Sequence, residues 1–228
     1  MIRCALLAAV AVLALGPLAW SQSKSLTQGA HRMELMLERL DGATWKTVDP
    51  ALVLAHGDRV RFRFRTNFDG YLYVTNQGTS GKYDQLFPRQ ETGQDNHIAS
   101  GKDYQVPATS VAFRIDGPPG HEVVYWLVSP VKLTDVPSRP IVPPAGNTTP
   151  ITLMPRCDEG VMKARGDCID SSAGPKLIPR DVQVSKGLGA ANAASRDLLF
   201  IREQNTAVIS SPAPLTGPVI YEFQLAHR

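Results

Sequence analysis

The chain has 228 residues, of which 43% are hydrophobic and 20% are charged, and its formal net charge is +3. This length suits one large domain, or one medium domain that carries an insertion. The near balance of charge excludes a dedicated nucleic-acid binder, because such proteins carry a strong basic excess.

Residues 1–21 are predicted to form a secretory signal. Arg3 gives a positively charged start, residues 5–18 form an apolar run, and Ala19-Trp20-Ser21 is a small-x-small cleavage site. The run is shorter than the roughly 20 residues that a membrane-spanning helix needs. No transmembrane segment is therefore predicted in the mature chain, which we expect to be periplasmic or secreted after cleavage near Ser21.

Residues 22–32 are polar and lack periodicity, so they predict a flexible leader. Strand patterns begin at Met33, where apolar residues at 33, 35 and 37 alternate with their neighbours. The turn dipeptide Asp41-Gly42 then precedes residues 44–48, which together predict a β-hairpin. A helix over residues 33–40 is the competing interpretation.

The clearest strand covers residues 60–65, because Val60, Phe62 and Phe64 alternate strictly with arginines. Further short strands are predicted at 71–75, 85–87, 104–106 and 111–115, three of them followed by proline or by a proline-glycine turn. Residues 122–128 are apolar on both faces and predict a central strand that is buried on both sides. The last run, 219–225, again alternates and predicts a strand at the C-terminal end.

Many short strands without long helices between them indicate an all-β fold. We predict an immunoglobulin-like antiparallel β-sandwich with a Pro/Gly-rich, disulfide-stapled insertion. A single domain is expected over residues 33–228, with its core in 33–130 and 196–228 and the insertion in 131–195.

The insertion contains Cys157 and Cys168, the two cysteines that remain after the signal. An isolated pair in an oxidising compartment predicts a disulfide. A zinc site would need further ligands close by, and the five histidines are scattered along the chain. Asp158 and Glu159 favour the first turn of a short helix inside the bridged loop.

Several motifs occur in order between residues 55 and 130: Phe68-Asp69-Gly70-Tyr71-Leu72-Tyr73-Val74, Gln85-Leu86-Phe87-Pro88, Asn96-His97-Ile98-Ala99-Ser100-Gly101, Val106-Pro107 and Pro119-Gly120-His121-Glu122-Val123. Together they resemble the uncharacterised bacterial domain family DUF4384. The resemblance covers about a third of the chain, and flanking strands are expected to complete the domain. It implies a β-sandwich-like module, which in this family accompanies kinase-like or caspase-like domains or belongs to envelope and secreted proteins. It implies no known activity and no catalytic residues.

A row of arginines is the candidate binding surface. Arg59, Arg61, Arg63 and Arg65 share one strand face with about 6.5–7 Å between alternate residues. Guanidinium groups at this spacing could bind the anionic groups of a polysaccharide, a lipid headgroup or an acidic protein. The alternative is a solvated face paired with acidic side chains of neighbouring strands. In the binding interpretation, changing all four arginines to glutamine weakens envelope association and leaves the melting temperature nearly unaltered.

Enzyme motifs are absent: the chain has no Gly-x-Ser-x-Gly elbow, no His-Glu-x-x-His and no phosphate-binding glycine loop. No catalytic residue, cofactor or metal is predicted. The sequence predicts a non-catalytic module that binds a protein or glycan partner of the periplasm or envelope, and no nucleic acid. The alternatives are a hydrolase with a triad assembled from distant residues, to which His56 or His121 would supply the base, and a structural or assembly subunit.

Overall fold

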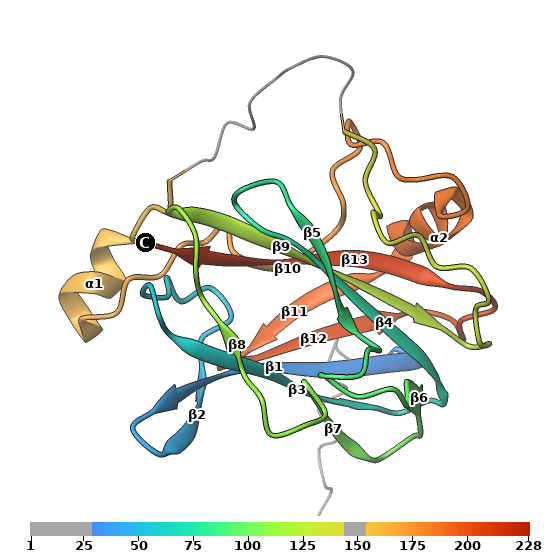
Figure 1. The fold of residues 1–228 in the computed structure, drawn as a ribbon, viewed down its shortest axis with the longest axis horizontal. Helices are drawn as coiled ribbons and strands as arrows, with labels where there is room; N and C mark the ends of the chain where they lie inside the picture. Colours follow the sequence, from blue (N-terminus) through green and yellow to red (C-terminus); the bar gives the residue numbers. More distant parts are fainter. Residues whose placement is uncertain (1–28, 144–153) are drawn as a thin grey trace, which may run out of the picture.

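A computed structural model describes residues 29–143 and 154–228 (Figure 1). The predicted signal 1–21, residues 22–28 of the predicted leader and residues 144–153 of the insertion lie outside the described residues. The strands form two antiparallel sheets that pack face to face. The prediction of an antiparallel β-sandwich is confirmed.

The seven-stranded sheet has the order β11-β12-β1-β3-β7, with β2 paired to β1 and β8 paired to β3. Its strands are β1 (His31–Asp41), β2 (Thr44–Val48), β3 (Arg59–Thr66), β7 (Asp103–Val106), β8 (Phe113–Arg114), β11 (Leu199–Glu203) and β12 (Thr206–Ser211). The first strand thus begins at His31, inside the segment predicted as leader.

The six-stranded sheet has the order β10-β13-β9-β4-β5, with β6 paired to β4. Its strands are β4 (Gly70–Gln77), β5 (Tyr83–Phe87), β6 (His97–Ile98), β9 (Gly120–Ser129), β10 (Gly174–Lys176) and β13 (Val219–His227). The helical segments described are α1 (Glu159–Arg165), α2 (Gly189–Ala194) and the 3-10 turn η1 (Ser195–Asp197).

Local sequence explains where these strands turn and which faces they bury. Gly42 has a φ of 60° in the β1–β2 turn, a conformation that glycine adopts without steric cost. The predicted hairpin is therefore confirmed over the helical alternative. β9 lies between β13 and β4 and buries both of its faces, as its two-sided apolar pattern predicts.

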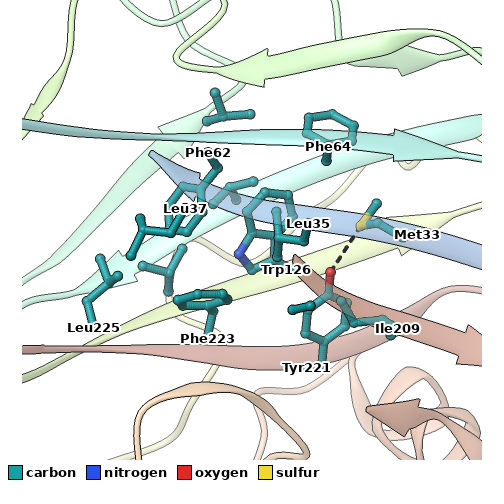
Figure 2. Packing of buried hydrophobic residues seen from close by; sticks show 14 of the residues in the cluster. Met33, Leu35, Leu37, Phe62, Phe64, Trp126, Ile209, Tyr221, Phe223 and Leu225 are labelled. Carbon is teal, nitrogen blue, oxygen red and sulfur yellow. Dashed lines mark hydrogen bonds between the residues drawn. The ribbon is translucent and has the colours of Figure 1, made fainter. Parts of the chain in front are cut away.

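Large aromatic side chains join the two sheets. The ring of Phe62 on β3 meets the rings of Trp126 and Phe223 edge-on, with centroids 5.3 Å and 5.2 Å away (Figure 2). Beside them, the hydroxyl of Tyr221 donates to the Met33 sulfur at 3.1 Å. All five side chains are buried, so the core lies between the sheets and is formed by residues far apart in sequence.

The insertion covers the outer face of the six-stranded sheet. Tyr73, Leu127 and Ile220 of the sheet form a second buried cluster with insertion residues such as Ile178 and Leu188. Figure 1 shows α2 lying over this side of the sheet. The segment is therefore a packed layer in its described parts, and the aromatic outer face of this sheet is not open to a partner.

A buried serine anchors the end of that layer. The hydroxyl of Ser195 donates to the Ala191 carbonyl at 2.6 Å and accepts the Ile220 amide proton at 2.7 Å. The first contact closes the end of α2 and the second attaches it to β13. One side chain thus fixes the helix on the sheet.

The predicted disulfide between Cys157 and Cys168 is present, with 4.7 Å between the Cα atoms. The predicted helix lies inside the bridged loop as α1, where the Asp158 carboxylate accepts the Val161 amide at 2.9 Å. The Val53 amide donates to the Cys168 carbonyl at 2.8 Å. The bridged loop is therefore attached to the sandwich through its backbone.

Replacing Phe62 by alanine should test the aromatic contact between the sheets. The change removes a fully buried ring that contacts both Trp126 and Phe223, so we expect a loss of about 3–5 kcal/mol in the free energy of unfolding. Denaturant unfolding followed by tryptophan fluorescence measures it. Val111→Ala is the control, because Val111 is largely exposed; equal losses in the two variants would contradict the packing described.

Candidate functional site

The four predicted arginines all lie on β3 and point away from the core. Arg59 and Arg65 are exposed, and the Arg63 side chain is 41% exposed. Val60, Phe62 and Phe64 alternate with them and are buried. The predicted stripe therefore exists on the outer face of the seven-stranded sheet.

A buried glutamate contacts the two middle arginines of this row and neither of the arginines at its ends. Glu38 on the neighbouring β1 is only 4% exposed, and its carboxylate lies 2.6 Å from Arg61 Nε and 3.4 Å from Arg63 Nη1. The Arg61 guanidinium also lies over the Trp45 ring, 4.3 Å from its centroid. Arg61 thus serves the fold, because it neutralises a carboxylate that water does not reach.

Arg59 and Arg65 are in a different situation, since neither forms an ion pair with any described residue. Arg59 lies directly opposite Arg114 of β8, which pairs with Asp116 at 3.1 Å. Two like charges opposite each other on adjacent strands repel, and an anion placed between them relieves the repulsion. Arg65 lies opposite Glu34 of β1 and Asp103 of β7 but forms no ion pair with either. Both ends of the row therefore keep an exposed guanidinium group available to an anionic ligand.

Among the described residues, neither suggested histidine base is placed between a serine and a carboxylate as a serine triad requires. His121 Nε2 lies 3.2 Å from Asp170 Oδ2 and 3.3 Å from Ser172 Oγ, so one ring nitrogen faces both groups. An activated serine needs the carboxylate and the hydroxyl on opposite ring nitrogens. His56 is exposed and lies 3.9 Å from Asp116. This geometry does not activate Ser172 as a nucleophile.

Asp170 instead attaches the insertion to the sheet. Its carboxylate accepts the backbone amides of Arg156 and Ser172 at 2.8 Å and 2.9 Å and the Ser172 hydroxyl at 2.7 Å. Burial acts to raise the pKa of Asp170, but these hydrogen bonds outweigh it and hold the pKa below its ordinary value. The carboxylate is thus kept charged at neutral pH, in contact with His121 of β9.

The outer face of the six-stranded sheet contains one more buried carboxylate. Glu222 on β13 is 3% exposed, accepts a hydrogen bond from Gln224 at 2.9 Å and lies 3.9 Å from Lys176. Burial raises the pKa of Glu222 to about 7, although Lys176 and Gln224 both act to lower it. The side chain therefore titrates near neutral pH.

A cleft of about 440 Å³ opens at one end of the space between the sheets. Its apolar lining includes Val60 and Phe62 of β3, and its polar lining includes Asn76 of β4 and Glu122 of β9. This cleft was not predicted from the sequence. The available signal was the position of Glu122, which shares the buried side of its strand with Val124 and Trp126.

Within residues 29–143 and 154–228, no group of three or more His, Cys, Asp or Glu side chains is placed to hold a metal ion. No helix in the same residues has the length and apolar character needed to cross a membrane.

Comparison with known proteins identifies one family. The family model described as "Domain of unknown function (DUF4384)" matches residues 53–132, which confirms the resemblance seen in the sequence. The match runs from the residues before β3 to just beyond β9, so it includes the arginine row and most of the cleft. Neither the curated proteins nor the solved structures contain a match to the chain.

Replacing Arg61 by methionine should separate the folding role from the binding role of the arginine row. The change leaves the Glu38 carboxylate buried with only the longer Arg63 contact, so we expect the free energy of unfolding to fall by about 2 kcal/mol. Arg59→Met should change it little, because Arg59 is exposed. Denaturant titration of both variants measures the difference, and equal stabilities would show that the Glu38 pair is dispensable.

Replacing Glu222 by glutamine should change the pH dependence of stability. A raised pKa in the folded state means that folding binds a proton, so wild-type stability falls as the pH rises from about 4.5 to about 7. The glutamine side chain does not titrate, so the variant lacks this loss. Above about pH 7 the variant should be more stable than the wild type by roughly 3 kcal/mol, and below about pH 4.5 the two should be equally stable. Thermal unfolding across pH measures the effect. The exposed-residue control Glu159→Gln should follow the wild type throughout.

Proposed function

We propose that the protein is an exported, non-catalytic β-sandwich module that binds an anionic protein or glycan of the cell envelope through the arginine row of β3. The observation that carries the proposal is the exposure of Arg59 and Arg65, neither of which forms an ion pair with a described residue. Arginines held only for solubility or strand pairing are usually matched by acids on adjacent strands. Here Arg61 pairs with Glu38, whereas Arg65 lies opposite Glu34 of β1 and Asp103 of β7 without forming an ion pair with either. Arg59 lies opposite Arg114.

Export is supported by two independent features. The N-terminal pattern of residues 1–21 is that of a cleaved signal. The Cys157–Cys168 disulfide is the form that a cysteine pair takes in an oxidising compartment. Both favour the periplasm or the extracellular space as the place where the module acts.

A binding role agrees with the arrangement of the two outer faces. The insertion packs over the six-stranded sheet, while the arginines of the seven-stranded sheet keep contact with solvent. A guanidinium group can donate two parallel hydrogen bonds to a carboxylate, sulfate or phosphate. A rigid strand holds such groups at a fixed spacing, which suits a ligand with repeated negative charges.

Changing Arg59 and Arg65 together to glutamine should weaken envelope binding. Each exposed ion pair contributes up to about 1 kcal/mol, so the double variant should bind isolated envelope roughly tenfold more weakly and lose most of the salt dependence of binding. Co-sedimentation with envelope at low and high ionic strength measures both effects.

The matched control is Arg165→Gln with Arg180→Gln, which removes two exposed arginines from the insertion. This control should bind like the wild type, and both double variants should keep the wild-type melting temperature. Treating the envelope with protease or with glycan-degrading enzymes before sedimentation separates a protein ligand from a glycan ligand. If the wild type and the Arg59/Arg65 variant bind envelope equally well, the arginine row is not the binding surface.

A further inference from the structure

The cleft between the sheets contains polar side chains where a sandwich ordinarily has apolar ones. Along β9 the residues that face the other sheet are Val128, Trp126 and Val124, which are almost fully buried, and the next residue of the same alternation is Glu122. On β4 the alternation Leu72, Val74 ends in the same way at Asn76. The inner face thus changes from apolar to polar at one end of the sandwich.

These two polar residues contact each other inside the cleft. The Asn76 amide donates from Nδ2 to Glu122 Oε2 at 3.2 Å. On the far side of Asn76, Asp84 of β5 lies directly opposite it in the sheet. Glutamate, asparagine and aspartate therefore form a row across three strands, beside an apolar surface that includes Phe62 and Leu225.

Among the described residues, one hydrogen-bond acceptor in this row is unmet, and one carboxylate has no counterion. Asn76 Oδ1 is buried and accepts no hydrogen bond from any described residue. A buried acceptor without a donor costs about 1–3 kcal/mol, which a ligand that supplies the donor recovers. Glu122 forms no ion pair with a described residue, although cations lie near by.

The nearby cations are already engaged by other acids. Lys82 lies 2.9 Å from Asp84, and Arg114 lies 3.1 Å from Asp116. The cleft therefore has one carboxylate in excess of its positive charges. Burial raises the pKa of Glu122, and the charges of Asp116 and Asp84 raise it further. A cation bound beside Glu122 would stabilise the charged carboxylate and so lower its pKa, against the effects of burial, Asp116 and Asp84.

We propose that this cleft binds a primary ammonium group carried on an apolar chain. The ammonium group pairs with Glu122 and donates a hydrogen bond to Asn76 Oδ1, while the chain packs against Leu86 and Phe113, two half-buried apolar residues of the lining. The cleft volume of about 440 Å³ is within the range of small-molecule sites. The same chemistry is offered by a free alkylamine and by a lysine side chain of a protein. The site is independent of the arginine row, which selects the opposite charge.

The test uses the whole mature protein and three probes with the same six-carbon chain: hexylamine, 1-hexanol and hexanoate. Chemical-shift titration of the side-chain amide of Asn76 should show saturable binding of hexylamine, at least tenfold weaker binding of the alcohol and none of the carboxylate. Hexylamine affinity should also rise with pH as Glu122 loses its proton. Equal affinity for the amine and the alcohol, or no saturable binding of the amine, would overturn the proposal without any variant.

Glu122→Gln should reduce hexylamine affinity at least tenfold, because the amide keeps an acceptor for Asn76 but removes the charge. Glu34→Gln is the matched control, since Glu34 lies on the outer face of the seven-stranded sheet. Unchanged affinity in the folded Glu122 variant would also reject the site. Lysine blocked at both its amino and carboxyl ends serves as the second amine: binding comparable to that of hexylamine identifies a protein lysine as the ligand, and markedly weaker binding identifies a free amine.

Discussion

The contact of Phe62 with Trp126 and Phe223 is the interaction on which the rest of the structure depends. It joins β3 of one sheet to β9 and β13 of the other, and it requires that each strand place alternate residues on the inner side. Once Phe62 is fixed inside, Arg61 and Arg63 must point outward. A slip of one residue would bury the arginines and expose the rings, so packing of the core also determines the outer surface.

The outer faces of the two sheets differ in how they avoid exposing apolar residues to solvent. On the six-stranded sheet, aromatic and aliphatic residues such as Tyr73 and Ile220 are covered by the insertion, which Ser195 and Asp170 attach at two places. On the seven-stranded sheet, charged residues cover the strands, and the acidic side chain of Glu38 is itself buried beneath Arg61 and Arg63. Of the two outer faces, the charged one is therefore the less covered in the described part of the molecule.

The alternation of β3 and β13 and the two-sided apolar run of β9 could be predicted from the sequence. β12 was missed although Thr206, Val208 and Ile209 favour strands, because the run is short and lacks a clear two-residue alternation. Its place is fixed by its neighbours β1 and β11. The covering role of the insertion was missed for a similar reason: Ile141, Ile178 and Leu188 are isolated apolar residues in a Pro/Gly-rich segment. The arginine row was predicted, but its division by Glu38 depends on the β1–β3 register, which sequence alone does not provide.

The cleft and the arginine row are built on the same strands and face opposite ways. Val60 and Phe62 line the cleft, whereas Arg59 and Arg61 alternate with them on the outer surface. On β8, Arg114 lines the cleft and is also the strand partner of Arg59. It is therefore a cation close to both surfaces. Because Arg114 is paired with Asp116, it does not serve as the counterion of Glu122 in the cleft. A single sandwich can therefore combine the proposed anion-binding face with the proposed ammonium-binding cleft.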